Sequence, residues 1–226
     1  MTVLDNLEMI QSNIFQACER SNRRTEDVKI IGVTKYVSCE RAREAVDAGV
    51  LHLGENRKEG LLKKRQAISD DKVNWHFIGS LQSRKVKEVI DYIDFLHSLD
   101  RLSLAKEINK RAKKPVQCFV QVNISGEESK HGLQENELED FVQQLKHFDK
   151  IKVIGLMTMA PHIDNEQEIR QIFRRLKEWQ TDIQEKKWDH APCTELSMGM
   201  SNDYQIAIEE GATFVRIGTA LVGKDE

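Results

Sequence analysis

The chain has 226 residues, 39% of them hydrophobic, and a formal net charge of −3. Its 34 lysines and arginines do not outnumber its 37 aspartates and glutamates, which argues against a general nucleic-acid binder. The length suits one domain, because α/β barrels of roughly 200–250 residues fold as single domains. We therefore expect residues 1–226 to form one domain.

Neither a metal site nor a secreted or membrane protein is indicated. The four cysteines are far apart and form no CxxC pair, so neither a zinc site nor a disulfide framework is predicted. The N-terminus lacks the basic and apolar regions of a signal peptide. No apolar run approaches the roughly 18 residues that a membrane span needs. We expect a cytoplasmic protein with no metal and no membrane partner.

Helices and strands are predicted to alternate along the whole chain. An amphipathic helix over 4–20 comes first, because its apolar residues recur at spacings of three and four. Short apolar runs then alternate with helical segments. The predicted strands cover 30–35, 51–55, 75–79, 95–99, 116–122, 153–159, 195–199 and 214–218. The predicted helices between them cover 38–48, 56–67, 82–92, 101–113, 135–148, 165–187 and 203–210.

This alternation predicts an α/β fold with a parallel sheet. Strands separated by helices pair in parallel through right-handed crossovers. Eight such units predict a single (β/α)8 TIM barrel with an extra N-terminal helix. An open doubly wound sheet is the competing architecture, but it usually carries a glycine-rich phosphate loop after its first strand. Here the first strand ends in Thr34-Lys35-Tyr36, which favours the barrel.

A lysine, Lys35, stands at the carboxyl end of the first predicted strand. Lysine is almost never fully buried without a partner, and burial lowers its pKa because desolvation disfavours the charged form. A neutral amine is a nucleophile that can form a Schiff base with an aldehyde. On this stretch alone, the simpler interpretation is a strand that ends at the solvent with Lys35 extending outward.

Residues suited to a phosphate follow the last two predicted strands. Active sites of barrels lie at the carboxyl ends of the strands, and phosphate commonly binds in the loops after the seventh and eighth. Met200 and Ser201 follow the seventh strand, and Gly218 and Thr219 follow the eighth. Their main-chain N–H groups and hydroxyls could hold a phosphate. A helix N-cap explains Ser201 equally well, and the same role is the usual one for Asn56 after the second strand.

Arg216 lies within an otherwise apolar predicted strand. It either pairs with a carboxylate of the barrel or acts as a planar cationic donor toward a ligand. An amine at Lys35, a phosphate site at the last two loops and this donor together describe a pocket for pyridoxal 5′-phosphate (PLP). The aldehyde would join Lys35, and Arg216 would face the pyridine nitrogen or the phosphate.

Six blocks of the sequence resemble the YggS/PROSC family of pyridoxal phosphate homeostasis proteins, in the right order and over nearly the whole chain. The blocks are Val33-Thr34-Lys35, His52-Leu53-Gly54-Glu55-Asn56, Trp75-His76-Phe77-Ile78-Gly79-Ser80-Leu81-Gln82, Gly155-Leu156-Met157-Thr158-Met159, Leu196-Ser197-Met198-Gly199-Met200-Ser201 and Arg216-Ile217-Gly218-Thr219. The resemblance implies a barrel like the N-terminal domain of alanine racemase, fold type III among PLP proteins. It also implies that Lys35 holds PLP as a Schiff base. The residues expected to bind the cofactor are Lys35, Asn56, Met200, Ser201, Arg216, Gly218 and Thr219.

A carrier role is favoured over catalysis. A cationic Arg216 at the pyridine nitrogen would disfavour protonation of the ring, which makes the ring a poorer electron sink. Racemisation with two bases needs a second acid or base within reach of the ligand. Tyr36 is expected to point away from Lys35, since neighbours on a strand alternate faces. We therefore expect no catalytic residues and a role in intracellular PLP (vitamin B6) and amino-acid homeostasis, as the resemblance implies.

Two other functions stay open at this point. One is a PLP-dependent enzyme such as a weak amino-acid racemase, and the other is a Schiff-base aldolase that acts on a phosphorylated sugar. The expected partners are PLP and PLP-dependent apo-enzymes, and the expected state is a monomer or a weak homodimer. His76 and His97 are interpreted as core or rim histidines, because no metal-ligand spacing surrounds them.

Overall fold

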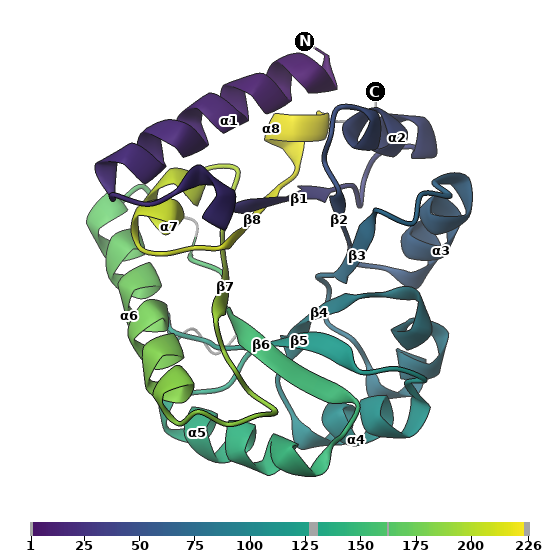
Figure 1. Cartoon of the computed structure of the whole chain (residues 1–226), viewed down its shortest axis with the longest axis vertical. Coiled ribbons are helices and arrows are strands. Elements are labelled where there is room, and N and C mark those ends of the chain that lie inside the picture. Colours follow the sequence, from purple (N-terminus) through teal and green to yellow (C-terminus); the bar gives the residue numbers. More distant parts are fainter. Residues whose placement is uncertain (1, 127–130, 162, 224–226) are drawn as a thin grey trace.

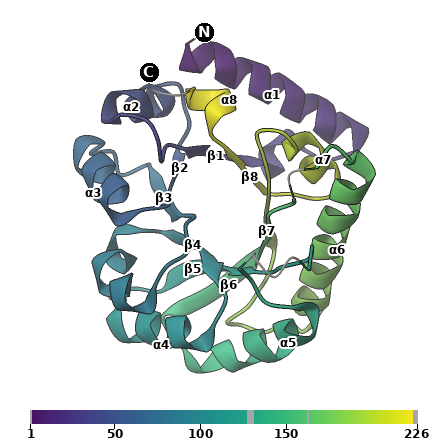
Figure 2. The same cartoon turned by 180° about the vertical axis from the view of Figure 1, so that it is seen from behind.

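The strands of the protein close into a barrel. The computed structural model describes residues 2–126, 131–161 and 163–223. Within them, eight parallel strands follow one another in sequence order, from β1 to β8, and helices surround the ring (Figure 1). The view from behind shows the same ring with α1 outside it (Figure 2). The predicted TIM barrel with an extra N-terminal helix is confirmed.

The elements alternate as the sequence predicted, with small shifts at their ends. The strands are β1 (Lys29–Val33), β2 (His52–Glu55), β3 (Asn74–Phe77), β4 (Phe95–Leu99), β5 (Val116–Gln121), β6 (Ile151–Met157), β7 (Glu195–Met200) and β8 (Phe214–Ile217). The α-helices are α1 (Val3–Arg20), α2 (Cys39–Asp47), α3 (Lys58–Ala67), α4 (Leu102–Arg111), α5 (Glu135–Gln144), α6 (Glu166–Glu185), α7 (Tyr204–Glu209) and α8 (Thr219–Val222). Short 3₁₀ helices are η1 (Thr25–Asp27), η2 (Ser83–Glu88), η3 (Ile90–Tyr92) and η4 (Leu145–His147).

Two apolar clusters stabilise the barrel, one between the strands and the surrounding helices and one inside the ring of strands. The larger cluster includes residues of the surrounding helices and of the strands, such as Leu53 and Val215. The smaller cluster consists of Ile31, Phe95, Phe119, Ile154, Met157 and Phe214. Three of these six are phenylalanines, on β4, β5 and β8, and the ring of Phe214 contacts the other two across the barrel. The barrel interior is therefore filled by side chains, as in other barrels of this size.

The extra helix, α1, covers one side of the barrel. Thr2 caps its start: the main-chain N–H of Asp5 donates to the Thr2 hydroxyl over 3.1 Å, and the Asp5 carboxylate accepts from the N–H of Thr2. This reciprocal arrangement satisfies N–H groups that the first turn leaves unpaired. The buried face of α1 contacts α7 and α8 (Figure 1).

The connection between β3 and β4 differs from the expected helix over 82–92. Instead of an α-helix, η2 and η3 fill this segment. Val86 and Val89 are both buried and lie three residues apart. A 3₁₀ helix brings residues at this spacing onto one face, whereas β-branched side chains are less favourable in an α-helix. None of the helices in the described part of the chain is both long and apolar enough to cross a membrane.

We expect Gly155→Ala to destabilise the barrel strongly. Gly155 on β6 lies opposite Glu195 on β7, and a Cβ at this position would collide with the main-chain carbonyl of Glu195. A carbonyl held by a strand pair cannot move aside, so the free energy of unfolding should fall by about 3 kcal/mol. Urea denaturation followed by circular dichroism would measure the loss.

Gly32→Ala on β1 is the matched control. A Cβ there would approach side-chain atoms of Val50 and Leu221, 3.2 and 3.3 Å away, and these atoms can shift. We expect a loss of only about 1 kcal/mol. Equal losses in the two variants would contradict the proposed role of close strand contact at Gly155.

Candidate functional site

A large cavity opens at the carboxyl ends of the strands. Its volume is about 1220 Å³, and residues that follow β1, β2, β3, β6, β7 and β8 line it. All of the residues predicted to bind a cofactor line this one cavity. They are Lys35, Asn56, Met200, Ser201, Arg216, Gly218 and Thr219. The fold thus brings together positions that are spread along almost the whole chain.

Lys35 lies in a turn, beyond the end of its strand. Strand β1 ends at Val33, and the N–H of Val37 donates to the carbonyl of Thr34 over 3.1 Å to close the turn. The side chain of Lys35 is exposed at the cavity mouth rather than buried. An exposed amine on a flexible stem can reach a ligand in the cavity.

The expected orientation of Tyr36 is also wrong. Tyr36 lines the same cavity, and the ammonium of Lys35 lies 4.8 Å from the centre of its ring. The argument from alternating faces fails because both residues belong to a turn, where side chains no longer alternate. Tyr36 is 70% exposed, so the Lys35–Tyr36 pair borders the entrance to the cavity.

A buried ionic cluster fixes the start of this turn. The Thr34 hydroxyl donates to Oε1 of Glu55 over 2.6 Å, and Nζ of Lys64 lies 2.9 Å from the same oxygen. Oε2 of Glu55 is buried and has no hydrogen-bond partner among the described residues. A Cβ at Gly60 would come within 2.5 Å of Oε2, so only glycine leaves room there for the carboxylate. This cluster ties the residue before Lys35 to the residue before Asn56.

Arg216 is buried in the wall of the cavity, with 5% of its surface exposed. Its Nη1 donates to the Ser197 hydroxyl over 2.6 Å, and Nη2 donates to the carbonyl of Thr158 over 2.9 Å. Burial lowers the pKa of Arg216 to about 10, while the nearby carboxylate of Asp203 opposes this shift. Both hydrogen bonds go to neutral groups, so the site holds a positive charge deep in the barrel.

The loops after β7 and β8 lie next to each other at the cavity. Met200, Ser201 and Thr219 line it together with Gly218. The alternative role of Ser201 as a helix N-cap is not seen, because Asp203 is the residue that precedes α7. Gly199 has a φ of +88°, and its missing side chain makes room for α7 rather than for a ligand.

Three histidines lie along the barrel interior, on β2, β3 and β4. His76 and His97 are fully buried, as expected, and His52 is half-buried. Burial is the main cause that lowers the pKa of each, in His52 to about 4. The charges of Lys29 and Arg216 act in the same direction, on His52 and His97 respectively. The three imidazoles are therefore neutral at pH 7.

Sequence reasoning missed two residues at the cavity, Tyr36 and His97. Tyr36 was placed on the wrong side by the strand argument. From the sequence, His97 is interpreted as a core or rim histidine and is not linked to the site. Its position on β4 makes it an inward-facing residue. The alternation of β4 around His97 is the signal that could have pointed to the interior.

The chain matches the family model of the alanine racemase N-terminal domain over residues 6–226. A pyridoxal phosphate homeostasis protein of Aquifex aeolicus is 41% identical over 227 aligned residues, which cover 99% of each chain. The protein of the same name from Escherichia coli K12 is 34% identical, over 98% of this chain and 96% of that protein. The chain belongs to the alanine racemase N-terminal domain family, within the group of the pyridoxal phosphate homeostasis proteins.

Solved structures show the same barrel. PipY of Synechococcus elongatus, determined with PLP bound, is 29% identical and superposes with a TM-score of 0.86 over 98% of this chain and 100% of that chain. An alanine racemase of Clostridium difficile is 19% identical and superposes with a TM-score of 0.74 over 96% of this chain. This chain covers 56% of that racemase, and the likeness to it concerns the fold alone.

We expect Lys64→Met to destabilise the protein by about 3–5 kcal/mol. The substitution leaves the buried carboxylate of Glu55 without its cation, and an uncompensated buried charge costs several kcal/mol. Lys63→Met changes an exposed lysine on the same helix and should have almost no effect. Urea denaturation of both variants would measure the difference, and similar stabilities would contradict the role of the cluster.

The stability of the protein should fall as the pH drops from about 6.5 toward 4. The pKa of His52 is about 4 in the folded protein and about 6.5 in an unfolded chain, so the unfolded chain binds its proton first. From pH 7 to pH 5, His52 alone should lower the free energy of unfolding by about 2 kcal/mol. His52→Gln should remove this part of the loss, whereas His147→Gln, at an exposed position, should leave it unchanged. Urea denaturation at pH 7 and at pH 5 measures the free energy of unfolding. If His52→Gln loses as much stability between the two pH values as the wild type, the loss is not due to His52 and the prediction is wrong.

Proposed function

We propose that this protein binds PLP through Lys35 and carries it in the cell as part of PLP homeostasis. One observation carries the proposal: a single cavity combines an exposed primary amine, loop hydroxyls suited to a phosphate and a buried guanidinium. The relatives named pyridoxal phosphate homeostasis proteins and PipY with bound PLP support it.

The residues present fit the cofactor. The cavity has a volume of about 1220 Å³, which leaves ample space for a small ring with a phosphate. The walls supply apolar side chains, Val33 and Ile78 among them, against which a flat ring can pack. The donors divide into hydroxyls and main-chain N–H groups at the two loops and a cation below them. Such a set matches a phosphate ester at one end and an aromatic nitrogen at the other.

Each part of the site has a distinct task in this proposal. The amine nitrogen of Lys35 attacks the aldehyde carbon; a C=N bond forms, and the aldehyde oxygen leaves as water. Ser201 and Thr219 hold the phosphate by their hydroxyls, together with the main chain at Met200 and Gly218. Asn56, at the end of β2, lies beside the bound ring. PLP, when bound, supplies an electron sink for chemistry on amino acids.

We infer that Arg216 faces the ring rather than the phosphate. It lies on β8 before the Gly218 loop and bonds to Ser197 and Thr158, below the rim of the cavity. A cation there disfavours a proton on the pyridine nitrogen, since like charges repel. The ring is then a poor electron sink, which supports a carrier rather than an enzyme.

A weak PLP-dependent enzyme is the second candidate, and one observation favours it. Tyr36 lines the cavity beside Lys35, so a second acid or base is within the site after all. This removes the argument against a racemase, whereas the argument from Arg216 weighs only against transamination and decarboxylation. The aldolase is disfavoured by the match to PLP-binding relatives.

The remaining expectations are part of the same proposal. Residues 1–226 act as one cofactor-binding domain, as a monomer or a weak homodimer in the cytoplasm. PLP-dependent apo-enzymes receive the cofactor. This fits a reactive amine at an open cavity mouth, where a bound ligand stays accessible to a second protein.

We expect PLP added to the pure protein to give a new visible absorption band, and borohydride to fix one PLP on the peptide that contains Lys35. Lys35→Ala should abolish both the band and the adduct, because no other lysine among the described residues lines the cavity. Lys63→Ala, at an exposed position on α3, should retain both. Absorption spectra and peptide mass spectrometry provide the measurement. Adducts spread over surface lysines would refute the role of Lys35.

The loaded protein also separates the two candidates. Incubation with a panel of amino acids should give no racemisation or transamination above background in a chiral chromatography assay. Turnover that disappears in Tyr36→Phe would favour the enzyme and contradict the carrier. A protein that stays colourless and is trapped by borohydride only with a sugar phosphate would favour the aldolase.

A further inference from the structure

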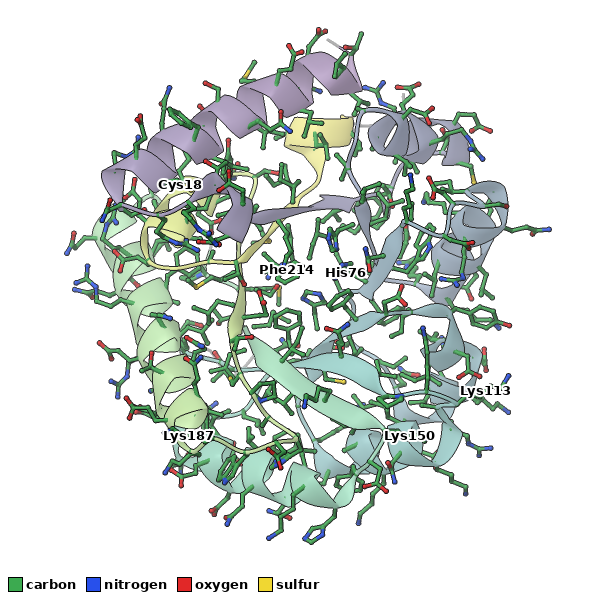
Figure 3. The ribbon with its side chains drawn as sticks, viewed as in Figure 1. Cys18, His76, Lys113, Lys150, Lys187 and Phe214 are labelled. Carbon is green, nitrogen blue, oxygen red and sulfur yellow. The ribbon has the colours of Figure 1, made fainter. Side chains whose placement is uncertain are left out.

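A line of hydrogen-bonded side chains runs through the barrel, from its amino-terminal end to the cavity. His52 Nδ1 lies 2.9 Å from His76 Nε2, and His76 Nδ1 lies 2.8 Å from His97 Nε2. His97 Nδ1 lies 2.9 Å from the Ser197 hydroxyl, which accepts from Arg216. Figure 3 shows His76 near the middle of the ring of strands, next to Phe214.

Aromatic rings enclose this line. His76 stacks on Phe95 with 4.2 Å between ring centres, and His97 stacks on Phe119 with 4.4 Å. Phe214 contacts His52 and His76 at their edges or at an angle. Buried polar groups in such surroundings must be satisfied by one another, because water does not compete for them. The side chains of the line therefore satisfy one another, and among the three histidines only the half-buried His52 is partly exposed.

Arg216 imposes a direction on these bonds. A guanidinium can only donate, so the Ser197 oxygen must accept from it. The single Ser197 proton is then best used toward Nδ1 of His97, its other partner among the described residues. His97 consequently carries its proton on Nε2 and donates to His76. By the same logic His76 donates to His52, so all three rings have a bare Nδ1 and a protonated Nε2.

The charges around the line agree with neutral rings. Lys29 on β1 faces His52 and His76, and Arg216 on β8 faces His97, so both cations disfavour further protons. Asp94, before β4, is the acidic group that acts on His52 in the opposite sense. A proton entering at His52 would reverse every bond and leave the Ser197 proton without an acceptor, because Arg216 cannot accept one.

We propose that His97, His76 and His52 form a one-way hydrogen-bond relay that positions Arg216 in the cavity. In the relay, the Ser197 hydroxyl donates its hydrogen bond to Nδ1 of His97. This fixes the orientation of the hydroxyl, so one of its lone pairs faces Nη1 of Arg216. The carbonyl of Thr158 fixes Nη2, so the guanidinium plane cannot turn. The histidines are positioning residues and act only through Ser197. The consequence for the cofactor, a fixed donor below its ring, rests on the proposed function.

Nitrogen-15 NMR of the histidine rings tests the relay on the full chain without PLP. Ring correlation spectra at pH 7 distinguish a protonated from a bare nitrogen. We expect His52, His76 and His97 each to have the proton on Nε2. A proton on Nδ1, or a charged ring, at any of the three would overturn the relay.

His76→Phe cuts the relay in the middle and retains an aromatic ring in the stack. His97 should keep its proton on Nε2, because Ser197 and Arg216 still set it, whereas His52 should become a mixture of the two neutral forms. The control His147→Phe, at an exposed position, should change neither. A change at His97 with a fixed His52 would show that the direction comes from the other end and would overturn the proposal.

Ser197→Ala gives an independent cut if His76→Phe does not fold. It removes the link to Arg216, so His97 should lose its preference for Nε2. An unchanged His97 in Ser197→Ala would overturn the proposal.

The positioning role has its own readout in PLP affinity. Absorbance titration should show about tenfold weaker binding of PLP to Ser197→Ala than to His147→Phe, since a guanidinium that has lost its Ser197 acceptor is no longer fixed and loses part of a charged hydrogen bond. Equal affinities would overturn the positioning role. If the wild-type chain does not bind PLP, the proposed function fails, while the ring spectra still decide on the relay.

Discussion

The parallel pairing of β8 with β1 is the constraint on which the rest of the structure depends. It closes the sheet and sets Ile31 opposite Arg216, so the two ends of the chain contribute to one site. The turn with Lys35 and the loop with Gly218 follow these two strands and therefore meet at the same rim. An open sheet of the same strands would leave the amine and the guanidinium at opposite edges.

Closure also creates an interior that must be filled, and here it is filled partly by polar groups. A guanidinium in such a place loses its hydration, and burial lowers the pKa of Arg216 to about 10. Neutral partners such as Ser197 and the carbonyl of Thr158 supply its hydrogen bonds. The neighbouring His97 stays neutral and so adds no repulsion. The deep position of Arg216 therefore depends on the polar groups that fill the interior.

The site separates its two nitrogen cations by depth. Lys35 is exposed on a turn whose first residue is tied to the buried Glu55, and it can move toward a ligand and away from it. Arg216 is fixed in the wall below. An exposed amine above a fixed donor is the combination on which the proposed capture of an aldehyde depends.

Much of this could be predicted from the sequence, because apolar periodicity depends only on local spacing. It determined the eightfold alternation, the barrel and the amphipathic α1, and the positions at strand ends gave the residues that line the cavity. One wrong prediction also concerns local structure. Segment 82–92 forms η2 and η3 instead of the predicted α-helix, because the buried Val86 and Val89 pack on one face.

The sequence by itself determined which residues reach the rim, since strand ends are encoded in a few neighbouring side chains. Only the tertiary structure decided that Lys35 is exposed, that Tyr36 shares its cavity and that three histidines line up behind Arg216. Exposure depends on which strands pair, and a hydrogen bond between His97 and Ser197 depends on the closure of the barrel. Such contacts join residues far apart in the chain, so no local pattern specifies them.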